Sequence, residues 1–209
     1  MKKRFLFCLL TGLIPIFSYA QDTIPNPSPC GMGLILNDAT CPDDRPFFDP
    51  NRFVISVNNA PGNTLGQDVY LKQVKLLIRH GWASDLDITL QSPGGQRIVL
   101  TSDNGGGDAN YGDPALPDCS GAVVFDASAC QAIDEEPAKA PFTAGPYQPE
   151  ESLLIFNDSL TNPNGDWLLD ICDDFEADSG YLDFVELVFE PLSCLPVSDV
   201  QILDIDTTT

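Results

Sequence analysis

The residues most suited to chemistry lie in one acidic, glycine-rich segment, Ser102–Asp113, which reads SDNGGGDANYGD. Calcium takes about six to eight oxygen ligands from carboxylates, amides and backbone carbonyls. The consecutive glycines of Gly105–Gly107 let the backbone bend tightly enough to add its own carbonyls. A solvated Asp/Gly turn is the alternative. The side chains expected to bind calcium here are Asp103, Asn104, Asp108, Asn110 and Asp113.

Two other acidic positions are expected to join in calcium binding. Val123–Phe125 is predicted to be a strand that carries Asp126 beside the first loop. A second acidic loop reads DDFEAD, and its Asp173 and Asp178 would complete the same site or hold a second ion. Neither loop has the glycine and glutamate spacing of an EF-hand. Calcium is therefore the expected cofactor, bound by irregular loops.

His80 is the only histidine and so the only candidate histidine base. A serine protease needs a nucleophile, a base and an orienting acid, and no G-x-S-x-G segment is present. We expect His80 to be structural, with its ring hydrogen-bonded within its own turn, for instance to Asp85. A carboxylate pair could hydrolyse glycosides, but 31 acidic residues make such a pair unspecific. The sequence predicts no catalytic residue and no enzyme.

Three aromatic residues are candidates for ligand contacts. Trp82 lies in a turn, where stacking on a sugar and ordinary packing are both open interpretations. Tyr111 lies within the acidic loop and is a further candidate ligand-binding residue. Trp167 lies in a W-x-L-x-I alternation, which favours a place in the core.

The elements that must position these residues are short strands. Alternating apolar residues, with polar residues between them, are typical of strands that bury one face. Glycine and proline together number 34 and punctuate the chain, and no segment has a capped helical period. These features predict an all-β sandwich or barrel with antiparallel sheets. The strands are expected around Phe53–Val57, Val74–Ile78, Leu86–Leu90, Arg97–Thr101, Trp167–Ile171 and Val185–Phe189.

The N-terminus has the features of a secretory signal peptide over residues 1–20. A basic start is followed by the mostly apolar run Phe5–Phe17 and by the cleavage sequence Ser18-Tyr19-Ala20. The run is too short for a membrane span. The formal charge of −21 becomes −24 once the three basic residues of this segment are removed. Acidity keeps a secreted protein soluble and disfavours nucleic acid as a partner.

Six cysteines remain after Cys8 leaves with the signal peptide. An even number in an exported protein predicts disulfides, and six cysteines permit about fifteen pairings. A local set is favoured, pairing 30 with 41, 119 with 130 and 172 with 194. A zinc site is the weaker alternative, because no C-x-x-C occurs. The cysteines are Cys30, Cys41, Cys119, Cys130, Cys172 and Cys194.

The expected organisation is a signal peptide, a lead-in over 21–50, a sandwich over 51–195 and a tail over 196–209. The lead-in is rich in Pro, Asn and Asp and is expected to be extended. The tail alternates like the first strand of a fibronectin type III repeat, so we expect the natural protein to continue, with a disordered acidic tail as the alternative. A single strand cannot bury itself.

Three blocks in order resemble the P domain, or Homo B domain, found beside subtilisin-like serine proteases. The first, Val74–Ile98, holds His80, Asp85-Leu86 and the turn Ser92-Pro93-Gly94-Gly95. The second, Asn164–Asp173, reads NGDWLLDICD, and the third, Asp178–Phe189, reads DSGYLDFVELVF. Together with short matches at 140–149, the resemblance covers roughly residues 53–191.

The resemblance implies a jelly-roll β-sandwich with disulfide-stapled loops. In that family the module commonly follows a catalytic domain and stabilises it, and similar modules stand alone in many exported bacterial proteins. Only about thirty residues separate the signal peptide from the sandwich, so we expect no protease domain before it. The insert between Cys119 and Cys130 departs from the family pattern.

The predicted function is that of a non-catalytic, calcium-binding module of a larger exported protein. Its partners would be neighbouring domains or a surface protein or glycan, and we expect a secreted or cell-surface monomer. The alternatives are a calcium-dependent carbohydrate- or surface-binding module and an accessory domain of a subtilisin-like serine endopeptidase, linked to proteolysis.

Overall fold

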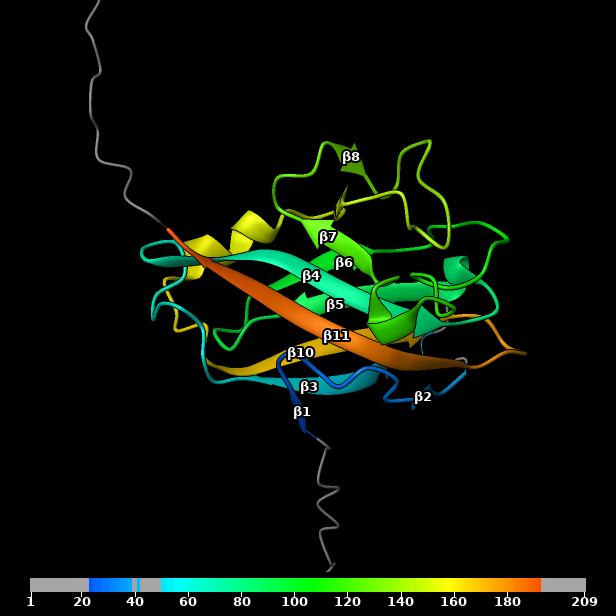
Figure 1. The fold of residues 1–209 in the computed structure, drawn as a ribbon, viewed down its shortest axis with the longest axis horizontal. Coiled ribbons are helices and arrows are strands. Elements are labelled where there is room, and N and C mark those ends of the chain that lie inside the picture. Colours follow the sequence, from blue (N-terminus) through cyan, green and yellow to red (C-terminus); the bar gives the residue numbers. More distant parts are fainter. Residues whose placement is uncertain (1–22, 39–40, 42–49, 193–209) are drawn as a thin grey trace, which may run out of the picture.

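The computed structural model describes residues 23–38, 41 and 50–192, which form two sheets packed face to face (Figure 1). One sheet has the strand order β1-β3-β10-β5-β6, and the other β2-β11-β4-β7-β9-β8. The predicted signal peptide and C-terminal tail, with Cys194, lie outside the described residues.

The strands match the predicted ones and extend beyond them. The first sheet holds β1 (Thr23–Pro25), β3 (Asn51–Val57), β5 (Leu86–Gln91), β6 (Arg97–Thr101) and β10 (Gly165–Asp173). The second holds β2 (Leu34–Leu36), β4 (Val69–Arg79), β7 (Val123–Asp126), β8 (Gln131–Ala132), β9 (Tyr147–Gln148) and β11 (Gly180–Pro191). Three 3-10 helices complete the described elements: η1 (Ala83–Asp85), η2 (Pro117–Cys119) and η3 (Leu153–Ser159).

The long central ladders are antiparallel, as predicted, but both sheets are mixed. β10 pairs antiparallel with β3 and with β5, and β4 pairs antiparallel with β11 and with β7. Parallel pairs occur at the margins, between β1 and β3 and among β7, β8 and β9. The wholly antiparallel prediction is therefore wrong at the edges. The sandwich is confirmed, and the jelly-roll connection remains a prediction.

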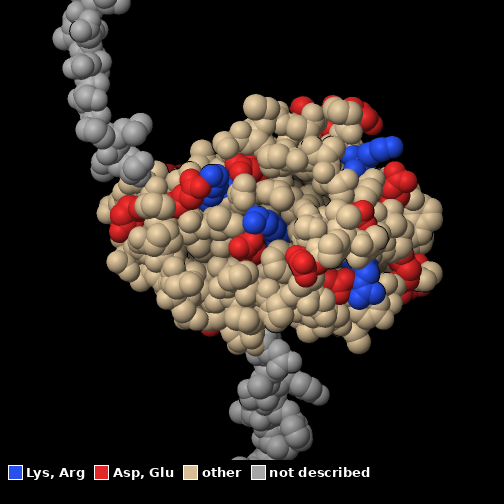
Figure 2. All heavy atoms as spheres, in the orientation of Figure 1, with Lys and Arg blue, Asp and Glu red and all other residues tan. Residues whose placement is uncertain are grey.

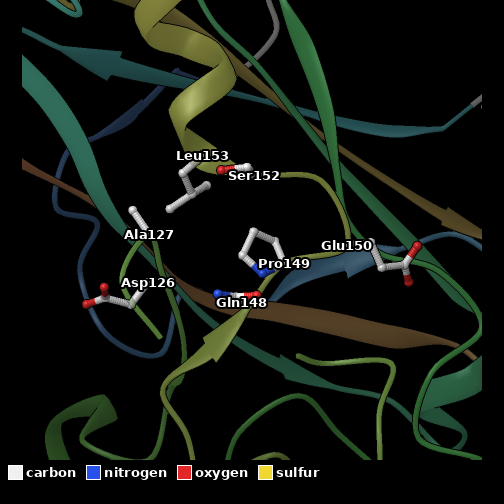
Figure 3. A pocket seen from close by; sticks show the side chains of 7 residues that line it. All are labelled: Asp126, Ala127, Gln148, Pro149, Glu150, Ser152 and Leu153. Carbon is white, nitrogen blue, oxygen red and sulfur yellow. The ribbon is translucent and has the colours of Figure 1, made fainter. Parts of the chain in front are cut away.

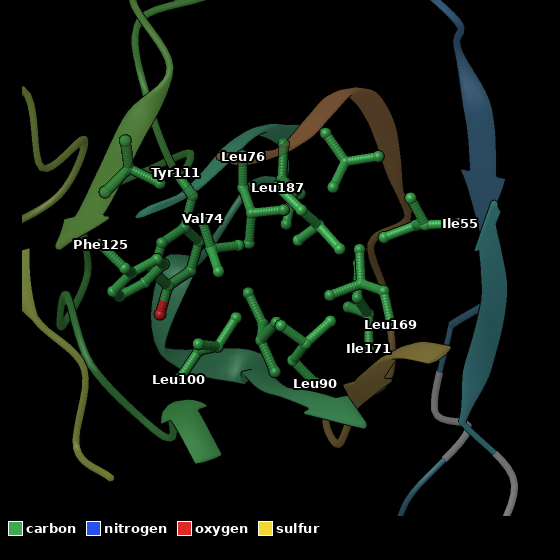
Figure 4. Packing of buried hydrophobic residues seen from close by; sticks show 14 of the residues in the cluster. Ile55, Val74, Leu76, Leu90, Leu100, Tyr111, Phe125, Leu169, Ile171 and Leu187 are labelled. Carbon is green, nitrogen blue, oxygen red and sulfur yellow. The ribbon is translucent and has the colours of Figure 1, made fainter. Parts of the chain in front are cut away.

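The inward-facing side chains of the two sheets form one apolar core (Figure 4). Trp167 is fully buried there and donates its indole N–H to the Pro163 carbonyl at 2.8 Å, as its alternation predicted. Its ring packs edge-on against Phe156 of η3. Burial of large side chains such as these stabilises a sandwich by about 1.5–3 kcal/mol each.

β5 departs from the predicted pattern of one buried face. Leu86, Ile88 and Leu90 are buried as expected, but Asp87 and Thr89 on the opposite face are buried as well. β5 lies between β10 and β6. The alternation of apolar residues therefore predicted the strand correctly, but it did not predict that the face carrying Asp87 and Thr89 is buried as well.

The lead-in contributes an edge strand to each sheet, which the sequence analysis did not foresee. β1 pairs with β3, and β2 pairs with β11. In Figure 1 the blue lead-in runs along the lower edge of both layers. Three-residue strands with no periodic pattern give a sequence reader little signal, because pairing with a neighbouring sheet edge defines them.

The favoured local disulfide pairing is wrong. The structure joins Cys30 to Cys119 and Cys41 to Cys172, across 89 and 131 residues. Cys130 is exposed and has no disulfide partner within the described part of the chain. Cysteines close in sequence were predicted to close loops, whereas the fold brings the lead-in against η2 and β10, which are distant in sequence.

Oppositely charged side chains pair across the outer face of β4 and β11. Lys75 pairs with Glu186 at 2.7 Å, and Lys72 pairs with Glu190. Figure 2 shows basic groups lying beside acidic ones on the same face. Cross-strand pairs of this kind contribute little individually, so this face is a solvated surface rather than a site.

Candidate binding site

A turn that follows β4, His80–Ala83, lies between the two acidic loops. On one side, the His80 N–H donates to the Asn110 side chain and the Ala83 N–H to the Asp108 carbonyl. On the other side, the His80 ring contacts Asp173. A single turn thereby holds two loops that lie about sixty residues apart in sequence.

His80 is 4% exposed, and both of its ring nitrogens face acceptors. Nδ1 lies 2.8 Å from the Trp82 carbonyl oxygen, and Nε2 lies 3.0 Å from Oδ2 of Asp173. The Trp82 N–H also approaches Nδ1, at the longer distance of 3.3 Å. The two shorter contacts are to acceptors and require two N–H donors, so the geometry favours the imidazolium.

The charge of the His80 ring is set by opposing effects. Burial opposes the protonated form most strongly. The hydrogen bonds to Asp173 and Trp82, together with the charges of Asp173 and Asp178, outweigh it and raise the pKa of His80 above its ordinary value. The ring and its carboxylates therefore form a buried, charge-assisted contact.

The predicted structural role of His80 has the right setting but a different partner. The ring does bond within its turn, to Trp82, but its carboxylate partner is Asp173 rather than Asp85. Asp178 lies 3.6 Å from Nε2 of the same ring. Glycine at position 81 lets Asp178 approach closely, because a Cβ on Gly81 would lie 2.1 Å from Oδ2 of Asp178 and would displace that carboxylate.

Asp85 completes this cluster. One ligand atom each from His80, Asp85 and Asp178 lie within 4.8 Å of one another, the only such group of three found among the described His, Cys, Asp and Glu residues. Burial chiefly, together with the charge of Asp178, raises the pKa of Asp85. Calcium prefers oxygen ligands, so a group that contains an engaged imidazole does not fit calcium well.

The first loop lines a hollow of about 380 Å³. Of its predicted ligands, the structure brings Asp103, Asn104 and Asp108 to this hollow. Gly105–Gly107 also line it, and two of these glycines have positive φ, at 102° and 55°. An acidic segment before β9 that the sequence analysis did not single out also lines the hollow: Asp134, Glu135 and Glu136.

The other predicted ligands lie elsewhere and have other contacts. Asn110 accepts the His80 N–H at 3.0 Å. Asp113 accepts the Ala115 N–H at 2.9 Å. Asp126 ends β7 as predicted, but its oxygens accept from Gln73 and Ser128.

A smaller hollow, of about 160 Å³, lies where β7 and β9 meet η3 (Figure 3). Asp126 and Glu150 both line it, but Figure 3 shows their carboxylates pointing in opposite directions. The Glu150 carboxylate accepts from the Ser102 N–H and the Asn104 side chain. Two carboxylates that diverge in this way are not arranged as the facing pair of a glycosidase.

The two aromatic candidates for ligand contacts, Tyr111 and Trp82, differ in their exposure. Tyr111 is fully buried, stacks on Phe142 with ring centroids 4.9 Å apart, and shares a hydrogen bond with Thr101. The ring and hydroxyl of Tyr111 are used inside the core, which does not favour the predicted ligand contact. Trp82 is 52% exposed and, with Asp85 and Phe175, lines a hollow of about 330 Å³.

Phe175 is the functional candidate that sequence reasoning missed. It is 65% exposed, an unusual state for so large an apolar side chain. The available signal was a single phenylalanine inside the acidic run DDFEAD. A phenylalanine with no periodic apolar neighbours has no predicted core face, so its loop position pointed to the surface.

These features define a disulfide-bonded β-sandwich whose loops, rather than its sheets, carry the candidate sites. The family model for the proprotein convertase P-domain matches residues 71–116. That segment runs from β4 through the first acidic loop and includes the first of the three resembling blocks, so the resemblance is confirmed there. No curated protein matches the chain.

The comparison and the structure agree on the setting of this module. A P-domain match suggests an accessory domain of subtilisin-like proteases. The two disulfides, together with that match, favour an extracellular location. Among the described residues, no helix has the length and apolar character needed to cross a bilayer.

Proposed function

We propose that this chain is a secreted, non-catalytic module that stabilises, or mediates interactions of, a larger exported protein. The observation that carries the proposal is the state of His80. Both ring nitrogens are engaged by Trp82 and Asp173, and the side chain is buried. A general base needs a free nitrogen within reach of its substrate, and His80 has neither.

The test is a protease assay on the purified chain. We expect no cleavage of fluorescently labelled casein, with or without calcium. The matched variants are His80→Ala, which removes the single histidine, and Asp166→Asn, an exposed change on β10. Cleavage that persists in Asp166→Asn and disappears in His80→Ala would overturn the non-catalytic proposal and favour an endopeptidase.

Calcium binding remains part of the proposal, now confined to the first loop. Its support is the hollow that Asp103, Asn104 and Asp108 line together with Asp134–Glu136. Among the described residues, the carboxylates of this hollow contribute no group of three within 4.8 Å. Side chains must therefore rearrange to surround an ion, which a glycine-rich loop permits.

A thermal melt with calcium and with chelator tests this site. Calcium at about a hundred times its dissociation constant would stabilise the fold by about 2.7 kcal/mol, which is roughly 5–11 °C for a domain of this size. We expect the shift to disappear in Asp103→Asn/Asp108→Asn and to persist in Asp166→Asn. Equal midpoints with calcium and chelator would show that the loop is a solvated turn.

Carbohydrate or surface binding is the second candidate function, and one observation favours it. Trp82 and Phe175 expose their rings beside one hollow, and exposed aromatic faces can stack on sugars. The loss of Tyr111 to the core weakens this candidate. A glycan array probed with the calcium-loaded chain tests it, and a blank array would remove it.

A further inference from the structure

We propose that the hollow between Trp82 and Phe175 binds an arginine side chain of a partner protein. The inference deepens the proposed function, since it rests on the view that the module mediates interactions. It names the chemistry of the partner group and the residues that would receive it.

The hollow has the size and the apolar surface that a flat cation requires. It measures about 330 Å³, its lining is nearly all apolar, and Trp82 and Phe175 are both more than half exposed. The Trp82 ring packs against Gly107, since a Cβ at that position would lie 3.0 Å from its six-membered ring. A guanidinium stacks on aromatic faces of this kind.

The charge beside the hollow is negative. Asp85 lines it directly, and Asp173 and Asp178 lie around the same histidine. Three carboxyl groups lie around one imidazole, so acidic groups outnumber basic ones in this cluster. No ion pair found between described residues gives Asp85 a lysine or arginine partner, and its hydrogen bond is to Ser84 at 3.3 Å.

The combination of two exposed aromatic rings with one carboxylate favours a cationic side chain over a neutral sugar as the ligand. Recognition of a sugar requires several polar groups placed around its hydroxyls, whereas this lining offers one carboxylate among apolar surfaces. Arginine matches both the aromatic rings and the carboxylate of this lining, because its planar face stacks on rings while its N–H groups reach a carboxylate. The strongly acidic chain would also steer a basic partner toward it.

The two tryptophans provide the measurement. Their indole N–H signals can be followed by NMR, with Trp82 at the hollow and buried Trp167 as an internal control. The probe is N-acetyl-arginine amide, compared with N-acetyl-citrulline amide, which has nearly the same shape without the charge. Calcium is held constant throughout. We expect arginine to shift the Trp82 signal saturably and to leave Trp167 unchanged.

Variants separate the parts of the site. Trp82→Leu and Phe175→Ala should weaken arginine binding by about fivefold or more, as expected for loss of a cation–π contact. Asp85→Asn should do the same by removing the charge, and Asp166→Asn, which removes an equal charge on β10, should leave binding unchanged. Where Trp82 is replaced, an arginine probe with a fluorine label reports binding instead.

Three outcomes would overturn the inference: no shift with arginine, equal shifts with citrulline, or a Trp82 shift produced by neutral oligosaccharides but not by arginine. The last outcome would indicate that the hollow binds carbohydrate, which is the second candidate function. Failure of the broader proposal is distinguishable, because casein cleavage dependent on His80 would contradict the non-catalytic role while leaving the arginine titration unaffected.

Discussion

The two acidic loops have similar compositions but different structures. The first loop, Ser102–Asp113, shares its carboxylates between an open hollow and local backbone contacts. The second, Asp173–Asp178, directs carboxylates onto a buried histidine. The second loop directly follows a buried strand end and a disulfide at Cys172. Both loops follow a strand whose last residues are buried, so the difference lies in the partner: the second loop directs its carboxylates onto a buried histidine, and the first does not.

The largest effect is expected from removing the covalent anchor of the second loop. Replacing both Cys41 and Cys172 by alanine should lower the free energy of unfolding by about 4 kcal/mol, because the bridge closes a long loop of chain. Chemical denaturation of the double variant measures this. A loss under about 1 kcal/mol would mean that the loop is held by its histidine rather than by the disulfide.

His80→Ala should be the next largest change. It removes the imidazole that contacts the buried Asp173 carboxylate, and breaking such a buried charged contact costs about 3 kcal/mol or more. The matched change in the first loop is Asn110→Ala, which removes the side chain that accepts the His80 N–H and should cost about 1 kcal/mol. Urea titration of both variants measures the two losses in free energy of unfolding. Equal losses would show that the two loops do not differ in how much they stabilise the fold.

Stability should fall as pH rises from about 6.5, the unfolded pKa of histidine, through the raised folded pKa of His80, and the contact of His80 with the second loop should be responsible. The pKa of His80 is raised in the folded state. Its contribution is therefore complete below its unfolded pKa of about 6.5 and is lost as pH rises through the folded pKa. Denaturation midpoints in that window should decline for the parent chain and stay flat in His80→Ala. A parallel decline in both would assign the effect to other groups.

The smallest effect belongs to the first loop without calcium. Asp103→Asn/Asp108→Asn should change the free energy of unfolding by no more than about 0.5 kcal/mol in chelator, as expected for surface substitutions. A loss comparable to that of His80→Ala would show that the first loop is as much a part of the core as the second.

The fold was largely predictable, because alternation marks a strand whatever it pairs with. The central strands β3, β4, β10 and β11 were each identified from the period of their apolar residues alone. The edge strands β1 and β2 were not, since neither has a periodic pattern and each exists through pairing with a distant partner. Disulfide pairing failed for the same reason.

The candidate sites were less predictable than the fold. Residue types located both acidic loops, but the sequence could not show that Asp173 meets His80, because that contact joins β10 to the end of β4. Nor could it show that Tyr111 turns inward onto Phe142. An exposed aromatic residue such as Phe175 can be recognised only when the residues of the core are known, because its exposure is defined by its absence from that core.

The long-range disulfides also determine how this chain would respond to a pulling force. Tension applied at the N-terminus would first load β1, which is held to β3 by hydrogen bonds and by the burial of Ile24, without a covalent link. At Cys30 the load passes through the disulfide to Cys119, which lies in the connection between β6 and β7. The strands that follow Cys30 in sequence, beginning with β2, are therefore not the next to be loaded. The slack that can be released from that end is therefore limited to the few residues before Cys30. A surface-exposed module tethered by its N-terminus would lose one edge strand under load and keep its sandwich closed.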